Sequence, residues 1–524
     1  MSTRCLRWFL GAILLTNVCQ GQAKPPATGG WKPALLLTDK TIHPSQLALA
    51  GNKVFFLVNE DHFHERAGRY QTTHLCVSDG TPAGTRTLRR VSDGSNPYEK
   101  AITAFGKLVL FSVAGPNGAD TLYRSDGTPA GTFALTSESG KAIGYPRQLL
   151  VVGNKAYLAQ MADQWCPSPN LWREFKTTVW ETDGLPRHTK EASFKAWSIS
   201  LMNGKIVTQP QMNSREAMTI DQDGVARPIV TPGWTQFVPS IQVGNQWFGF
   251  GLPENSDQPE TVVPQASALW QQATDFWRTQ QRTRTNHNPQ QVDNYDPTTQ
   301  FATYLGVQKN ATTTPPLLTW PVMVNPPLIV TSSQQLAVVF PNGLAIQTDG
   351  TVANTHPCRG LMTLGTSEPC GFKNSIYFFR LNEAQQTGGL ARFGKGTSRQ
   401  VKGLYRLTES GDAQLVDSTL QATPTVQPAN NWFYWQNPSR TVPVLTATAN
   451  ALYFQQGNYL IRWQGPGQLE KLPLPFETLL PFRHADYSPN ETTAVLEWAR
   501  GLLIMGEQKE TGRRLLYAIN RTIP

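Results

Sequence analysis

Short, unbroken apolar runs recur along the chain, and a small polar turn precedes each of them. Residues 54–58 (VFFLV) follow a Gly-Asn-Lys turn, and residues 108–111 (LVLF) follow a Gly-Lys turn. Runs of this length and composition predict β-strands rather than helices. Because the apolar residues are continuous and do not alternate with polar ones, we expect both faces of these strands to be covered, as in sheets that stack on other sheets.

The octapeptide SDGTPAGT occurs twice, at residues 78–85 and 125–132, each time between two predicted strands. In such a segment Asp closes a turn on its own backbone, Gly supplies a positive φ and Pro fixes the next corner. The Asp-Gly pair recurs in weaker copies at residues 182–184, 222–224 and 348–350. The repeat predicts structural turns at Asp79, Gly80, Asp126, Gly127, Asp183 and Gly184.

The spacing of these units predicts the architecture. Units of about 40 to 57 residues with roughly four strands each are typical of β-propeller blades. The composition agrees, because 42 Gly, 39 Pro and 15 Trp indicate many turns between short strands. We therefore predict an all-β propeller of seven to nine blades, with eight as the central estimate. A β-solenoid and two stacked sandwiches are the alternatives.

An unclosed ring of blades would leave strand edges exposed. We therefore expect the strand at residues 34–37 to complete the last blade.

The longest interruption of the strand pattern runs over residues 253–327, where Gln, Asn, Thr and Pro predominate. We interpret it as an insertion within the propeller. Residues 268–277 place Leu269, Ala273, Phe276 and Trp277 on one helical face, which predicts a short helix on the rim. Long insertions on a rigid scaffold often carry binding function, and a loop without function is the alternative.

The first 23 residues have the pattern of an export signal. Arg4 and Arg7 precede the apolar run at 8–15, and Gly-Gln-Ala at 21–23 resembles a cleavage site. We therefore predict a signal peptide over residues 1–23 and a secreted or periplasmic propeller over 24–524. The apolar run is shorter than the roughly 20 residues that span a bilayer, so no transmembrane span is predicted. Cys19 leaves open an outer-membrane lipoprotein.

Cysteines and charge add little to this interpretation. Four cysteines remain after cleavage, which permits two disulfides in an exported chain. Cys358 and Cys370 would close a short loop between consecutive strands, and Cys76 with Cys166 is a weaker pair. The net charge of +9 is spread along the chain without a basic run, so the sequence does not indicate a nucleic-acid partner.

Residues 75–85 and 122–132 resemble the ELWxSDGTxxGT repeats of exported bacterial propeller-like proteins. The match extends in part to residues 179–184 and is faint beyond them. The family's Glu-Leu-Trp opening is His-Leu-Cys at 74–76 and Thr-Leu-Tyr at 121–123. The resemblance implies a bacterial envelope or secreted location and a propeller scaffold, and it implies no particular activity.

Few side chains in the sequence indicate a catalytic, metal-binding or ligand-binding site. His62 and His64 would project to one side of an extended segment, which is the arrangement that a metal site in the loop between two strands could use. The repeated turn aspartates belong to separate blades, so we do not expect them to converge on calcium or to form a glycosidase pair. No nucleophile elbow or phosphate-binding loop is present in the sequence. Four tryptophans are candidate sugar or ligand contacts: Trp270, Trp277, Trp432 and Trp435.

Three functions fit the sequence. The favoured one is a non-catalytic, exported binding scaffold, a monomer without a cofactor, that presents loops to a protein or a glycan. The second is an enzyme that cleaves a glycan or a lactone at the central channel. The third is a lipid-anchored factor for envelope assembly. We predict no catalytic and no cofactor-binding residues.

The processing of the N-terminus is directly testable. We expect the mature protein from the exporting cell to begin at Lys24, because signal peptidases cut after small residues such as Ala23. Intact-mass spectrometry measures this. A mature chain that begins with a lipid-modified Cys19 would contradict the prediction and support the anchored alternative.

Overall fold

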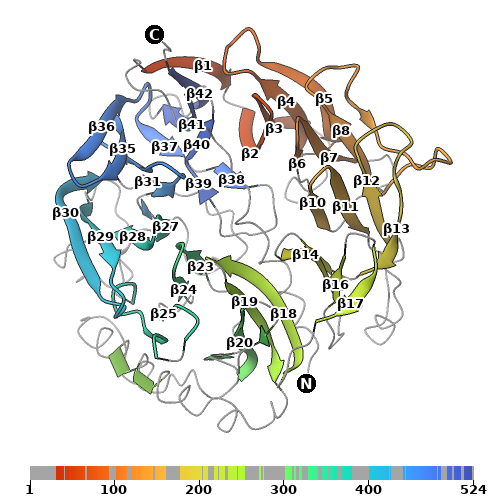
Figure 1. Cartoon of the computed structure of the whole chain (residues 1–524). Helices are drawn as coiled ribbons and strands as arrows, with labels where there is room; N and C mark the ends of the chain where they lie inside the picture. The colour runs from red at the N-terminus through yellow and green to blue at the C-terminus, as the bar shows by residue number, and fades with distance from the viewer. Residues whose placement is uncertain are drawn as a thin grey trace. The chain divides into compact units, whose positions relative to one another are not determined.

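The computed structural model describes residues 31–39, 42–64, 68–93, 102–114, 120–144, 148–160, 178–196, 198–202, 205–209, 218–221, 224–229, 234–244, 246–253, 271–272, 275–276, 301–309, 312–313, 318–321, 328–339, 345–351, 353–362, 369–380, 401–423, 425–426, 441–442, 444–480, 482–484, 492–498, 501–508 and 513–521. Most of these residues lie in β-strands (Figure 1). Among them, no helix is long and apolar enough to cross a membrane.

The chain divides into two compact units, and one of them combines the first described strands with the last ones. This unit, Asn17–Ile229 with Phe482–Pro524, is called unit 2 here, and Val230–Pro481 belongs to unit 1. Unit 2 contains five sheets, each with at least four antiparallel strands: β40 Val495–Trp498, β41 Gly501–Gln508, β42 Arg513–Arg521 and β1 Trp31–Asp39; β2 Ile42–Ala50, β3 Lys53–His64, β4 Gly68–Ser78 and β5 Arg86–Asp93; β6 Ile102–Phe105, β7 Leu108–Ala114, β8 Asp120–Ser125 and β9 Phe133–Ala134; β10 Gln148–Val152, β11 Lys155–Gln160, β12 Thr178–Thr182 and β13 Lys190–Lys195; β14 Ser198–Met202, β15 Lys205–Gln209, β16 Met218–Ile220 and β17 Ala226–Pro228.

Unit 1 continues with four sheets of the same kind: β18 Trp234–Val243, β19 Gln246–Pro253 and β20 Phe301–Lys309, with β21 Thr312–Thr313 and β22 Leu318–Pro321; β23 Leu328–Thr331, β24 Leu336–Val339, β25 Ala345–Thr348 and β26 His356–Pro357; β27 Cys370–Phe372, β28 Ser375–Phe379, β29 Val401–Leu407 and β30 Ala413–Ala422; β33 Thr446–Ala447, β34 Leu452–Gln456, β35 Tyr459–Gly465 and β36 Gln468–Pro473. A small sheet pairs β31 Thr425–Val426 with β32 Thr441–Val442, and β37 covers Thr478–Leu480.

Within most of these sheets each strand pairs with the next one along the chain, so the sheets are antiparallel meanders. Sheets of this kind packed side by side in chain order are the blades of a β-propeller. The fold is therefore the all-β propeller that the repeat predicts. The described residues contain nine sheets of four or more strands, and the number of blades stays a prediction.

The hydrophobic core lies between neighbouring sheets. Phe55 and Leu75 of the sheet β2–β5 pack with Val109 and Phe111 of the sheet β6–β9, and all four are at most 2% exposed. The run at 54–58, which the sequence predicts to be covered on both faces, is buried throughout. Burial of an aromatic or aliphatic side chain stabilises the fold by about 1.5–3 kcal/mol. The stability of each sheet therefore depends on its neighbours.

The first and the last described strands pair in one sheet. β1 pairs antiparallel with β42, with Trp31 opposite Arg521 and Ala34 opposite Ala518. This confirms the prediction that the N-terminal strand completes the last blade. A second closure lies nearby, where β38 Phe482–His484 pairs in parallel with β2 and covers its free edge.

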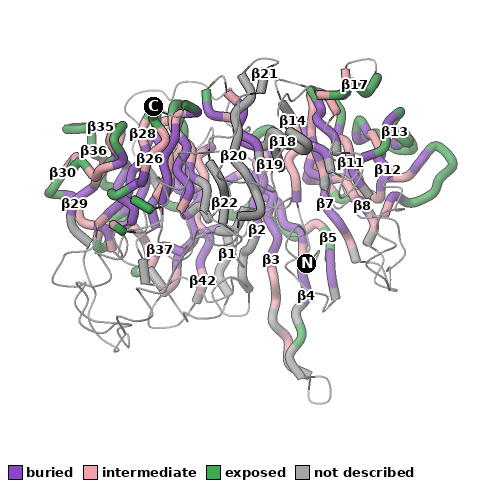
Figure 2. Tube along the Cα trace, turned by 90° about the horizontal axis from the view of Figure 1, so that it is seen from below, coloured by how far each residue is buried: buried purple, intermediate pink, exposed green. Residues whose placement is uncertain are grey.

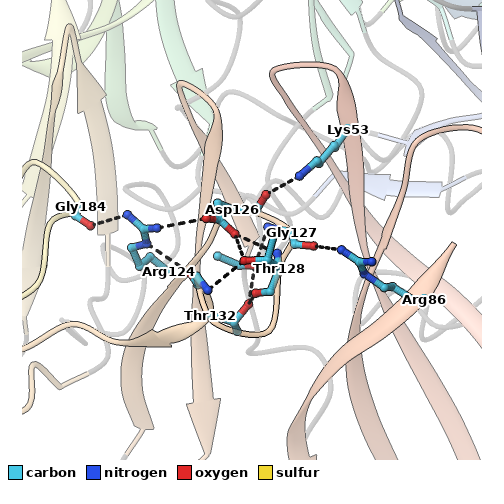
Figure 3. Close-up of polar contacts among 10 residues, drawn as sticks. Lys53, Arg86, Arg124, Asp126, Gly127, Thr128, Thr132 and Gly184 are labelled. Carbon is cyan, nitrogen blue, oxygen red and sulfur yellow. Dashed lines mark hydrogen bonds and ion pairs between the residues drawn. The ribbon is translucent and has the colours of Figure 1, made fainter. Parts of the chain in front are cut away.

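The octapeptide forms a turn that is closed by its own side chains. In the second copy, the Oδ1 atom of Asp126 accepts hydrogen bonds from the backbone N–H of Thr128 at 2.8 Å and from its hydroxyl at 2.7 Å (Figure 3). Gly127 has a φ of +88°, which is available to glycine at little cost. A Cβ at Gly131 would overlap the Asp126 carboxylate. The first copy has equivalent bonds and a similar glycine conformation.

Four turns of unit 2 also dock on the preceding sheet, and the carbonyl of the turn glycine accepts a hydrogen bond there. Figure 3 shows one case, in which Arg86 of β5 donates to Gly127 and Lys53 of β3 donates to the neighbouring Asp126 carbonyl. The same acceptor is used at four boundaries of unit 2: Asn520 Nδ2 to Gly80 at 2.9 Å, Arg86 Nη2 to Gly127 at 2.6 Å, Arg124 Nη1 to Gly184 at 3.0 Å and Ser193 Oγ to Gly224 at 3.1 Å. The turns thus connect blades as well as strands.

The segment 253–327 contains strands that its composition did not predict. β20 lies within it and pairs with β19 over Gln246–Gly251, so the segment supplies the third strand of this sheet. Within the predicted helix at 268–277, residues 271–272 and 275–276 are helical, and Gln271 Nε2 donates to Asp275 Oδ1 at 2.9 Å. Leu269, Ala273 and Trp277 lie outside the described residues.

The docking of the turns generates a stability prediction. Gly80→Ala should lower the free energy of unfolding by about 3 kcal/mol, because the φ of +86° is strained for Ala and the new Cβ would overlap the Trp498 ring. Gly106→Ala is the matched control, since its φ is +61° but no atom lies within 4 Å of the added Cβ. It should cost about 1 kcal/mol. Urea unfolding measures both, and equal losses would contradict the docking interpretation.

Candidate functional site: the polar face of the β3–β4 hairpin

The hairpin of β3 and β4 is longer than its counterparts in neighbouring sheets. β3 has 12 residues and β4 has 11, whereas β7 and β8 have 7 and 6. The two strands stay in register as far as the pair His64 and Gly68. Figure 2 shows that they extend well past β5, the neighbouring strand of their own sheet.

The distal part of the hairpin has no lateral strand on either side within the described pairing. β2 accompanies β3 as far as Glu60, and β5 accompanies β4 as far as Thr72. Glu60 and Thr72 are opposite each other in the β3–β4 pairing, so β2 and β5 both stop at the same cross-strand pair. Residues 61–64 and 68–71 therefore form a two-stranded extension, called the hairpin extension here. Such a ribbon is marginal alone in water, and the blade supports its base.

Alternate residues of the two strands share one face. On one face of the hairpin the opposed pairs are Val58 with His74, Glu60 with Thr72, and His62 with Tyr70. Beyond Val58, this face has only polar and aromatic side chains. We call Glu60, His62, Tyr70, Thr72 and His74 the polar face.

The side chains of the polar face contact one another. His62 Nε2 lies 2.8 Å from the Thr72 hydroxyl, and His74 Nε2 lies 3.3 Å from the same oxygen. The His62 ring stacks on the Tyr70 ring with 5.0 Å between centroids. Thr72 is buried beneath these groups, and 40% of Tyr70 is exposed. The face is therefore ordered by its own contacts and also accessible.

Glu60 lies between the two imidazoles. Its Oε2 atom is 3.7 Å from Nε2 of His62 and 3.7 Å from Nε2 of His74. The three side chains are 39%, 31% and 26% exposed, so solvent screens these contacts.

The structure places the two predicted metal candidates differently from the sequence interpretation. His62 and His64 lie in β3 itself rather than in a loop, because pairing with β4 continues to His64. Among the described residues, no group of three His, Cys, Asp or Glu side chains is arranged to hold a metal ion.

Sequence reasoning missed most of the polar face. The strand-like alternation of Glu60, His62 and His64 was available, as was that of Tyr70, Thr72 and His74, but the register that opposes them was not. The other predicted contacts, Trp270, Trp277, Trp432 and Trp435, lie outside the described residues.

Cys358 and Cys370 are free thiols in the structure, which shows no disulfide between them. The two cysteines belong to different sheets. Cys358 follows β26, the last strand of one sheet, whereas Cys370 begins β27 of the next sheet. Cys358 is buried, with its Sγ 3.8 Å from Oε1 of Gln347. Cys76 is also a buried free thiol, and Cys166 lies outside the described residues.

Comparison with known proteins gives no family and no function. No family model matches the chain, and no curated protein matches it. Among solved structures, similarity extends to the Pyrococcus horikoshii acylaminoacyl peptidase, with 8% identity, a TM-score of 0.34, and coverage of 81% of this chain and 59% of that one. The chain thus spans less than two thirds of the peptidase.

Two further similarities cover nearly all of the other chain. The β-propeller domain of the trilobed protease from Pyrococcus furiosus has 11% identity, a TM-score of 0.31, and coverage of 72% of this chain and 99% of that domain. YCF48, solved bound to a D1 peptide, has 10% identity, a TM-score of 0.29, and coverage of 95% of this chain and 99% of that one. Similarity at this level carries no functional argument.

The buried thiols should react slowly. Burial raises the pKa of Cys76 to about 11, although a hydrogen bond with Thr87 opposes the shift, and burial raises that of Cys358 to about 12. At pH 8 about 0.1% of Cys76 would be thiolate. We expect native iodoacetamide labelling of both cysteines to be slow and to rise about tenfold per pH unit between pH 8 and 10.

Peptide mapping of the labelled protein measures these rates. Labelling in denaturant without reductant should modify Cys358 and Cys370 fully. A peptide that joins Cys358 to Cys370 in a non-reducing digest would overturn the free-thiol assignment.

Proposed function

We propose that this protein is an exported, non-catalytic interaction scaffold, and that the hairpin extension is the element that contacts its protein or glycan partner. The observation that carries the proposal is the extension of β3 and β4 beyond both of their neighbours. A propeller blade does not need these residues for its own packing, because the core of this blade consists of residues nearer the base, such as Phe55 and Leu75.

The chemistry of the extension supports recognition. Tyr70 offers a large, rigid and half-exposed ring, and aromatic residues of this kind are common anchors in interfaces. The two edges beyond Glu60 and Thr72 have no strand partner in the described pairing. An extended peptide could pair with either edge through its backbone, which favours a protein partner.

The test removes the extension and keeps the blade. Glu60 and Thr72 are opposite each other, so an Asn-Gly turn can replace residues 61–71 and join them directly. We expect this shortened variant to retain the unfolding midpoint of the wild type. It should bind the partner at least about 30-fold more weakly, which corresponds to loss of about 2 kcal/mol.

The partner is identified by mass spectrometry of what wild type, but not the shortened variant, retains from envelope and extracellular fractions, or by a glycan array. Its dissociation constant is then measured with purified components. Tyr70→Ala should weaken binding about tenfold. Tyr459→Ala is the matched control, because Tyr459 is 45% exposed on β35 of unit 1 and should have no effect. Equal binding by wild type and shortened variant would refute the proposal.

A further inference from the structure

The repeated turns contain Asp-Gly bonds. Among the peptide bonds that follow an aspartate, these are the most prone to form a succinimide and then isoaspartate. The glycine nitrogen attacks Cγ of the preceding aspartic acid, the C–N bond forms, and the carboxyl hydroxyl leaves with a proton as water. Water then opens the resulting succinimide at either carbonyl and yields aspartate or isoaspartate. The reaction needs a glycine nitrogen free to lose its proton and a protonated, mobile carboxyl group.

In four turns the glycine N–H donates a hydrogen bond to the hydroxyl oxygen of the residue before the aspartate. The bonds are equal in length: Gly80 N to Ser78 Oγ, Gly127 N to Ser125 Oγ, Gly184 N to Thr182 Oγ1 and Gly350 N to Thr348 Oγ1, each at 3.0 Å. The residue is Ser in two turns and Thr in the other two, so the hydroxyl is the feature they share. All four glycines have a positive φ.

A second hydroxyl fixes the first one. Seven residues further on, the Thr132 hydroxyl lies 2.7 Å from Ser125 Oγ and donates to the Thr128 carbonyl at 2.6 Å. The other three turns have the same hydroxyl contact: Ser78 with Thr85 at 2.7 Å, Thr182 with Thr189 at 3.0 Å and Thr348 with Thr355 at 2.7 Å. The final Thr of the octapeptide therefore has a role in orienting the group that binds the glycine nitrogen.

The aspartate is held as well. Its Oδ1 atom accepts the N–H of the residue after the glycine in every one of these turns: Thr81 at 3.0 Å, Thr128 at 2.8 Å, Leu185 at 2.9 Å and Thr351 at 2.9 Å. The carboxylate is thus bonded beyond the glycine and cannot turn toward the glycine nitrogen without breaking this contact.

The protonation state also opposes cyclisation. Partial burial raises the pKa of Asp126, but hydrogen bonds from Thr128 and the charges of Arg124 and Lys53 outweigh it, so the pKa lies below its usual value. The pKa of Asp183 and that of Asp349 are lowered in the same way by their turn hydrogen bonds, which outweigh burial. An ionised carboxylate has no hydroxyl to lose as water.

We propose that the Asp-Gly bonds of these turns are latent sites of isoaspartate formation, and that the hydroxyl of Ser78, Ser125, Thr182 or Thr348 protects each one by binding the glycine N–H. Conversion would add a methylene to the backbone inside the turn. Since the carbonyls of Gly80, Gly127 and Gly184 dock on the preceding sheet, conversion of one of these turns would loosen a boundary between blades.

The test uses Ser125→Ala in the full-length protein, held at pH 7.4 and 37 °C. Peptide mapping with methyltransferase labelling measures isoaspartate at Asp126 and, in the same molecules, at Asp79. We expect the rate at Asp126 to rise about three- to tenfold, which corresponds to about 0.7–1.4 kcal/mol, and the rate at Asp79 to stay unchanged. Ser78→Ala should give the reverse result.

Two further variants separate the hydroxyl from general loosening. Ser125→Thr keeps the hydroxyl and should retain the wild-type rate, since Thr occupies this position in two other turns. Thr348→Val in unit 1 replaces only the hydroxyl with a methyl group and should raise isoaspartate at Asp349, which keeps the test valid if Ser125→Ala does not fold. Unchanged rates in folded Ser125→Ala and Thr348→Val, or equal rises at Asp79 and Asp126 in Ser125→Ala, would overturn the proposal.

Discussion

The hydrogen bond to the carbonyl of the turn glycine is the directional contact that recurs at the blade boundaries of unit 2. It is made by Asn520, Arg86, Arg124 and Ser193 in turn, each reaching from one sheet to the turn of the next. The donors differ in chemistry, whereas the acceptor is always backbone. Because a backbone carbonyl is present whatever the side chains are, the docking geometry persists where the octapeptide has diverged.

The turn has two structural roles, internal closure and docking on the preceding sheet, and different atoms perform them. Its side chains close the turn internally, as Asp126 does with Thr128, and its glycine faces outward to the preceding sheet. Side chains also fill the position of Gly131 in weaker copies, where His188 and Asn354 contact the turn aspartate directly. The repeat therefore tolerates substitution when the new side chain satisfies the same carboxylate. Hydrophobic burial between sheets then contributes the larger, non-directional part of the stability.

Against this regular background, the β3–β4 hairpin stands out because it continues beyond what packing requires. Its base pairs with β2 and β5, and within the described residues its distal part is held by cross-strand contacts such as the stack of His62 on Tyr70. A rigid base with an exposed aromatic ring such as Tyr70 beyond it is an arrangement that suits recognition, since little ordering entropy is lost on binding.

The sequence by itself determined the strands, the Asp-Gly turns and the propeller class, because a turn's φ values, local hydrogen bonds and apolar runs are properties of adjacent residues. It also determined that the N-terminal strand joins the last blade. Only the tertiary structure decided that β20 arises within 253–327, that Cys358 and Cys370 belong to different sheets, and that Glu60 meets His74. These outcomes depend on strand register and on contacts between distant segments, and a shift of one residue would move every side chain to the other face.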